Sequence, residues 1–357
     1  METNAQPVGR IVKVVRDVSR AEIYNTEEHR SFPVSIYYPS LTSRENVPAS
    51  TILSLFHPAT NQALDLFSDV GIEEDMLTSV KIPVVQNGHP KAVGPLPVVI
   101  FSPGFGIDRD LYVEVVTRVV QSGYVVVAVG APYDSFLTVY PDGTVTAQAN
   151  KHPSDNDQLE VRMKDIRLVM EQLDEWNEDS LRGLLAVDRI AMMGHSLGGA
   201  AAFNVAATDE RVQCVVLLDA SLHLIHHKVR NFSVLNIRQE AASYSDYFDV
   251  MRAEEDEETS ERIARAYIEN QTWLYNQLPE TKSFVKIVGA NHLSFSTISR
   301  LISSAEPKVM SAIQELICSF VDEFVQAKHG VYTKFMTGAT RPSNVVAIDG
   351  AGIPMGT

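Results

Sequence analysis

The feature that most constrains the fold of this chain is a serine between glycines, where an apolar run meets a run of small residues. Residues 190–202 read Ile-Ala-Met-Met-Gly-His-Ser-Leu-Gly-Gly-Ala-Ala-Ala. A serine on a tight strand-to-helix turn has strained backbone dihedrals, so its neighbours two positions before and after must lack bulk. Gly194 and Gly198 meet this requirement. The pattern predicts that Ser196 is a nucleophile raised above the end of a sheet; an ordinary glycine-rich turn is the alternative.

Short apolar runs and helical patterns alternate along most of the chain. Strands are expected at 96–101, 124–129, 190–194, 212–218, 233–237 and 283–288, and helices at 110–122, 158–176, 197–207 and 308–327. This alternation predicts an α/β fold with a mostly parallel sheet and helices on both faces. Residues 11–16 and 32–39 alternate in polarity and predict antiparallel edge strands. Ligands of such sheets bind beyond the carboxyl ends of the strands.

The domain organisation predicted for the 357 residues is one domain over residues 1–328 with a loosely ordered tail at 329–357, which is rich in Gly, Thr, Ser and Pro. Three segments read as insertions near the mouth of the site: 41–95, 131–157 and 240–282. We expect them to roof the site, with a solvated surface excursion as the alternative.

The charge balance bears on the partners of the protein. The formal net charge is −15, and the isoelectric point is near 5.1. Nucleic acids and anionic membrane surfaces attract basic patches, so neither is an expected partner. No apolar run approaches 18 residues, and residues 1–7 are polar with no apolar signal core. These features predict a cytoplasmic protein without stable membrane insertion, and they are compatible with a homodimer.

The cysteines and clustered histidines do not predict a metal site. Cys214 and Cys318 both lie in apolar patterns and are expected to be free, buried thiols. His223, His226 and His227 lie close together, but no carboxylate or cysteine stands at a supporting spacing. We therefore expect no metal and no cofactor.

A serine hydroxyl reacts as a nucleophile only when a base removes its proton, and in this kind of sheet the expected chain order is Ser, acid, His. His292 follows the last apolar strand directly, in Gly-Ala-Asn-His, where a loop can bring the imidazole to Ser196. Asp219 and Glu240 each end a strand and compete as the acid that orients His292. Asp219 is the commoner residue type for this role, but the residues alone leave both acids open.

The negative charge that develops on a substrate oxygen needs hydrogen-bond donors. The backbone N–H of Leu197, at the N-terminus of the helix after the serine, is one candidate. The other is the N–H of Phe105, in the loop 102–106 that reads Ser-Pro-Gly-Phe-Gly. Gly104 in this loop allows the backbone to approach a substrate closely. An ordinary glycine-rich turn is again the alternative.

At these motifs the chain resembles the α/β-hydrolase superfamily, and within it the lipoprotein-associated type of platelet-activating-factor acetylhydrolase. The resemblance covers about residues 95–300 and includes 101–106, 194–199 and 217–220, which look like the oxyanion loop, nucleophile turn and acid motif of that family. It implies an α/β-hydrolase fold and a serine esterase, and it favours Asp219 over Glu240 as the acid. Pro103 stands where that family usually has histidine.

Together these features predict a serine hydrolase that cleaves a carboxylic ester through a Ser-His-Asp triad and an acyl-enzyme. A short-acyl ester, a lactone or another small-molecule ester is the expected substrate. One alternative is a biosynthetic enzyme on the same scaffold that catalyses acyl transfer, condensation or cyclisation of a dedicated intermediate. Another is a binding protein that retains the triad without using it.

Overall fold

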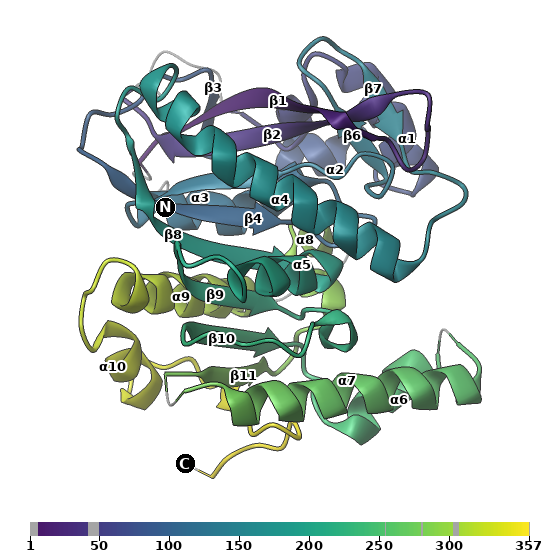
Figure 1. Ribbon diagram of the computed structural model, residues 1–357, viewed down its shortest axis with the longest axis vertical. Helices are drawn as coiled ribbons and strands as arrows, with labels where there is room; N and C mark the ends of the chain where they lie inside the picture. The colour runs from purple at the N-terminus through teal and green to yellow at the C-terminus, as the bar shows by residue number, and fades with distance from the viewer. Residues whose placement is uncertain (1–5, 42–49, 254, 280, 303–306, 357) are drawn as a thin grey trace.

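One mixed sheet crosses the molecule (Figure 1). The computed structural model describes residues 6–41, 50–253, 255–279, 281–302 and 307–356, and this part of the chain contributes ten strands to the sheet. Residues 42–49 of the predicted insertion 41–95 lie outside the described residues. In spatial order the strands are β12 (Val345–Ala347), β11 (Ser283–Ile287), β10 (Ser233–Arg238), β9 (Val212–Leu218), β8 (Leu185–His195), β4 (Leu96–Ser102), β5 (Val125–Val129), β2 (His29–Pro39), β1 (Val8–Ala21) and β3 (Val84–Gln86).

The centre of the sheet, from β11 to β5, is parallel, as the alternating pattern predicts. Strand β5 reads Val-Val-Val-Ala-Val, and all five residues are buried. Strands covered on both faces read as continuous apolar runs because neither side meets water. The architecture is therefore the predicted α/β arrangement, a large, mostly parallel sheet between helices.

Helices cover both faces of this sheet (Figure 1). Helices α3 (Val113–Gln121) and α9 (Pro307–Phe324) share one hydrophobic cluster with the strands, and α4 (Asp155–Glu178) and α5 (Ser196–Ala206) share the other. The remaining helices are α1 (Thr60–Asp69), α2 (Glu74–Ser79), α6 (Tyr244–Met251), α7 (Glu257–Gln277), α8 (Ile298–Ile302) and α10 (Val331–Thr337). Short 3-10 helices are η2 (Leu53–Phe56), η3 (Arg109–Tyr112), η4 (Leu222–Leu224) and η5 (His292–Phe295), and β6 (Leu137–Val139) pairs with β7 (Val145–Ala147).

The three predicted insertions contain most of these smaller elements. The described part of 41–95 forms η2, α1, α2 and β3, and the ring of Phe67 from α1 packs 4.8 Å from that of Phe136, just before β6. Segment 131–157 forms the β6–β7 ribbon, and segment 240–282 forms α6 and α7. Figure 1 shows the ribbon and α6–α7 at opposite ends of the sheet's carboxyl edge.

Two features of the sheet differ from the expectation. Of the two strands expected at the edge, β2 is interior because it pairs with both β1 and β5, whereas residues 11–16 of β1 pair with β2 alone, since β3 covers only residues 8–10 of that strand. The tail 329–357 is not loosely ordered where it is described, since residues 331–337 form α10 and residues 345–347 form β12, antiparallel to β11. Buried Tyr332, Val345 and Ile348 explain this order, because each removes apolar surface from water.

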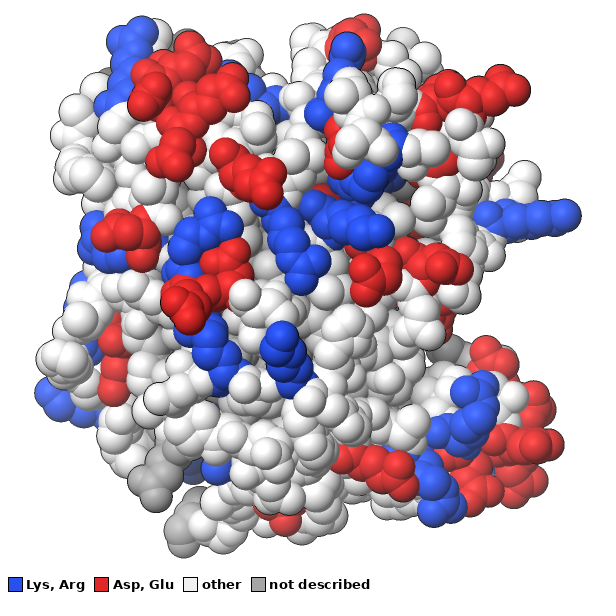
Figure 2. All heavy atoms as spheres, viewed as in Figure 1, with Lys and Arg blue, Asp and Glu red and all other residues white. Residues whose placement is uncertain are grey.

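The carboxyl ends of the parallel strands place the predicted site residues on one edge of the sheet. Ser196 follows β8, Asp219 follows β9, and His292 lies a short loop beyond β11. Figure 2 shows the surface indented at the right margin, between the upper part of the molecule and α6–α7, whose outer end carries a dense group of acidic and basic side chains.

Candidate active site

The predicted strand-to-helix turn at Ser196 is present and strained. Ser196 has a positive φ of 52°, a conformation that side-chain-bearing residues rarely adopt. A Cβ on Gly194 would lie 2.4 Å from the Gly198 carbonyl oxygen, and one on Gly198 would lie 2.3 Å from the carbonyl oxygens of both Ser102 and Pro103. Only glycine fits at these two positions, so the sequence requirement for small residues has a direct steric cause.

Asp219 and His292 lie in direct contact at the carboxyl edge. The distance between His292 Nδ1 and Asp219 Oδ2 is 2.6 Å, and Asp219 is 3% exposed while the side chain of His292 is 46% exposed. Burial by itself raises the pKa of the Asp219 carboxyl, but the charge of Arg238 and the hydrogen bond from His292 hold that pKa well below its usual range. An ionised Asp219 accepts from Nδ1–H, which leaves Nε2 of His292 as the basic nitrogen.

The Ser196 hydroxyl lies beside a second serine. Its Oγ is 3.4 Å from Ser221 Oγ, and Ser221 N donates to the Ser196 carbonyl over 2.9 Å. Asp219 and His292 are thus joined by a hydrogen bond. Among the described residues, Ser196 Oγ has its polar contact with Ser221 and not with His292. In unliganded enzymes, contacts between nucleophile and base are often long and shorten only with substrate.

Glu240, the competing acid, contacts the loop before His292. Its Oε2 accepts from Gly289 N over 2.8 Å, and its own N–H donates to the Ala290 carbonyl over 3.0 Å. Glu240 therefore holds the backbone that leads to His292, while Asp219 binds the imidazole.

The loop 102–106 presents one unused amide. Gly104 N donates to Tyr112 Oη over 3.0 Å, and Gly106 N donates to the Asp134 carbonyl over 3.0 Å. Within the described residues the N–H of Phe105 has no hydrogen-bond partner. The amide of Gly104 is thus bonded to Tyr112, and Phe105 N–H is the loop's candidate oxyanion donor; the close approach of Gly104 to a substrate stays a prediction. Leu197 N–H, in the first turn of α5, lies where helix amides lack intrahelical partners.

His195, between Gly194 and Ser196, connects the two halves of the site. It is 1% exposed; Tyr112 Oη donates to its Nδ1 over 2.8 Å, and its Nε2–H donates to the His292 carbonyl over 3.0 Å. Burial and the neighbouring His292 hold the pKa of His195 well below its usual value, so the ring is neutral, and these contacts assign the proton to Nε2. This chain of contacts, Gly104–Tyr112–His195–His292, thus ties the candidate oxyanion loop to the backbone of the candidate base.

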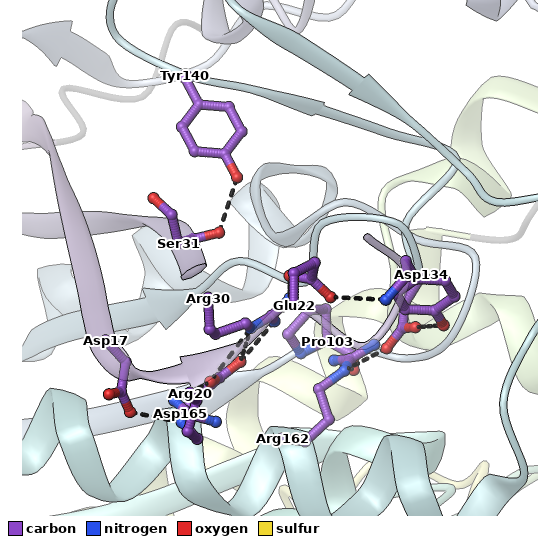
Figure 3. A network of polar contacts seen from close by, with 11 residues as sticks. Asp17, Arg20, Glu22, Arg30, Ser31, Pro103, Asp134, Tyr140, Arg162 and Asp165 are labelled. Atoms are coloured by element: carbon purple, nitrogen blue, oxygen red, sulfur yellow. Dashed lines mark hydrogen bonds and ion pairs between the residues drawn. The ribbon is translucent and has the colours of Figure 1, made fainter. Parts of the chain in front are cut away.

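Arg162, on α4, holds the same loop from the other side (Figure 3). Its Nε donates to Asp134 Oδ2 over 2.8 Å, and its Nη1 donates to the Pro103 carbonyl over 3.0 Å. The side chain is 2% exposed, so these bonds are shielded from water. Farther along α4, Asp165 binds Arg30, which also binds Glu22 over 2.7 Å (Figure 3). Sequence reasoning missed Arg162, Tyr112 and His195, since no local pattern marks them.

Cysteines and histidines also lie outside the site. Cys214 and Cys318 are free and buried, as predicted. His227 stacks on Trp273 with ring centroids 4.3 Å apart. Across the described ranges, no three His, Cys, Asp or Glu side chains are grouped to hold a metal ion. In those same ranges, every helix is too short or too polar to cross a bilayer.

The chain has the fold of the α/β hydrolases, and its resemblance to the platelet-activating factor acetylhydrolases is confirmed by comparison with known proteins. The family described as "Platelet-activating factor acetylhydrolase, isoform II" matches residues 19–172, and the family described as "alpha/beta hydrolase fold" matches residues 148–269.

Individual relatives agree with these family matches. A platelet-activating factor acetylhydrolase from Bos taurus is 28% identical over 172 residues, which are 40% of this chain and 39% of that protein. A probable 1-alkyl-2-acetylglycerophosphocholine esterase from Arthroderma benhamiae is 25% identical over 131 residues, 36% of this chain and 32% of that protein. The matches thus span about two fifths or less of these relatives. A solved ferulic acid esterase from Streptomyces cinnamoneus superimposes with a TM-score of 0.71 at 21% identity and covers 98% of both chains.

Proposed function

We propose that this protein is a serine carboxylester hydrolase that acts on a short-acyl ester, a lactone or another small-molecule ester. The observation that carries the proposal is the 2.6 Å contact between His292 and the buried Asp219, at the sheet edge where Ser196 occupies its strained turn. A base oriented by a buried carboxylate beside a half-buried hydroxyl on such a turn is the arrangement that activates a serine.

In the proposed reaction, Ser196 Oγ attacks the ester carbonyl while His292 Nε2 takes its proton. The N–H groups of Leu197 and Phe105 stabilise the negative oxygen of the tetrahedral intermediate. His292 then protonates the leaving alcohol, and the acyl group remains on Ser196. Water, activated by the same imidazole, releases the acid and restores the serine.

The relatives support hydrolysis over acyl transfer or cyclisation, because those matched are described as acetylhydrolases or esterases. We further propose that the described parts of segments 41–95, 131–157 and 240–282 roof the site within one domain. The exposed ring of Phe105 packs edge-on against His152 at 4.8 Å, which brings segment 131–157 to the oxyanion loop. The cytoplasmic location and the homodimer stay predictions.

A fluorophosphonate probe tests the nucleophile, because it phosphonylates activated serines. Wild type and Ser221→Ala should be labelled, and Ser196→Ala should not, which separates the two facing hydroxyls. The same proteins are assayed on p-nitrophenyl esters of increasing acyl length, where Ser196→Ala should lose at least about 10³-fold in kcat. Labelling of Ser196→Ala, or a folded wild type that hydrolyses none of these esters, would contradict the proposal.

A further inference from the structure

A buried arginine occupies the side of Asp219 that His292 leaves free. Arg238, the last residue of β10, donates from Nη1 to Asp219 Oδ1, while His292 binds Oδ2. The side chains of Arg238 and Asp219 are 0% and 1% exposed. Each oxygen of the carboxylate therefore has its own side-chain partner, with Gln239 N also donating to Oδ1 over 3.3 Å, and water does not screen the ion pair.

Two helices outside the sheet hold this arginine in place. Its guanidinium lies 4.0 Å from the ring centroid of Tyr267 on α7 and 5.4 Å from that of Tyr247 on α6. Its Nη2 donates to the Ala241 carbonyl over 3.3 Å, at the start of the segment that leads into these helices. A guanidinium is favourably placed over aromatic faces, so the rings of α6 and α7 help to hold Arg238 beside Asp219.

We propose that Arg238 is a positioning residue of the triad: it fixes the Asp219 carboxylate for His292, offsets its negative charge, and couples it to helices α6 and α7. The inference rests on the proposed ester hydrolysis and deepens it. Under this inference, helices α6 and α7 both cover the site and support the Asp219 carboxylate.

The charged and titratable groups around the Asp219–Arg238 pair come from five elements. Arg238 is on β10, His292 begins η5, His195 ends β8, and Tyr267 and Tyr247 come from α7 and α6. A cation beside the carboxylate opposes proton uptake by the Asp219–His292 pair as a unit. Without that cation the pair takes up its proton at higher pH. The acid limb of the pH–rate profile, where activity is lost by protonation, must then move to higher pH.

The test compares Arg238→Gln, which keeps an amide donor but loses the charge, with Arg238→Lys, which keeps the charge but loses the planar fork. Profiles of kcat/KM against pH are measured with p-nitrophenyl acetate. We expect Arg238→Gln to move the acid limb upward by about one pH unit and Arg238→Lys to leave it within a few tenths. The matched control is Arg230→Gln, since Arg230 also lies over a ring, that of Phe232 at 5.1 Å, but binds backbone carbonyls instead of the triad. Its acid limb should not move.

A second readout does not require turnover. The hydrogen-bonded Nδ1–H proton of His292 is followed by NMR against pH in the resting protein, where Arg238→Gln should shift the transition upward as in the rate profile. If the wild type hydrolyses no ester, the proposed function fails, but this titration still decides the inference.

An unchanged limb and titration in folded Arg238→Gln would overturn the inference, as would equal shifts in Arg238→Gln and Arg238→Lys. Should these variants not fold, Tyr267→Leu keeps the ion pair but removes the ring against which Arg238 packs. A smaller shift in the same direction is then expected, and no shift would overturn the inference.

Discussion

Replacing Tyr112 with phenylalanine should loosen the proposed oxyanion loop without removing a side-chain contact of the proposed triad. The hydroxyl accepts from Gly104 N over 3.0 Å and donates to His195 Nδ1 over 2.8 Å, and Tyr112 is 0% exposed. Its removal leaves two buried polar groups without a partner. Each such group costs roughly 1–3 kcal/mol, so the free energy of unfolding should fall by about 2–6 kcal/mol.

The same substitution should slow catalysis, because the loop that carries Phe105 N–H loses one of its anchors. Complete loss of an oxyanion donor costs about 10²–10³-fold in kcat, so a loosened donor should cost about 10–100-fold. Urea unfolding measures the stability. The value of kcat is measured by hydrolysis of p-nitrophenyl acetate under conditions in which the variant is fully folded.

Tyr38→Phe is the matched control. Tyr38 is 1% exposed and donates to the Gly88 carbonyl over 2.7 Å, in β2 and away from the sheet's carboxyl edge. It should lose about 1–3 kcal/mol and keep its kcat, because a single carbonyl is left without a partner. A kcat of folded Tyr112→Phe within twofold of that of Tyr38→Phe would refute the coupling between this hydroxyl and the oxyanion loop.

Two further substitutions follow from close contacts. Gly198→Ala should reduce kcat to below about 1% of wild type and lower the free energy of unfolding by about 1–3 kcal/mol, because the new Cβ must displace the carbonyls of Ser102 and Pro103. Wild-type turnover in this variant would disprove the steric account. Deleting residues 329–357 should lower the urea midpoint of unfolding and promote aggregation. The deletion uncovers the edge of β11 and the ring of Phe320, whose centroid lies 5.1 Å from that of Tyr332. An unchanged midpoint would show that the tail does not stabilise the core.

Local requirements explain why much of the site was predictable. The turn at Ser196 needs glycine at fixed offsets, and this need is visible in a few consecutive residues. The apolar runs that end before Asp219 and His292 mark the carboxyl ends of parallel strands, which must share one edge of the sheet. Strand order was less accessible, because the alternation in residues 32–39 indicates an extended segment but does not specify its partners on both sides.

By itself the sequence determined the α/β alternation, the glycine-flanked turn at Ser196, His292 as candidate base and Asp219 or Glu240 as candidate acid, since each follows from periodicity or spacing along the chain. The tertiary structure decided which groups support them. Tyr112, His195 and Arg238 act through hydrogen bonds or ion pairs to residues distant in the chain, and no spacing encodes such contacts. Burial then sets their strength, because a polar contact far from water is both stronger and costlier to lose.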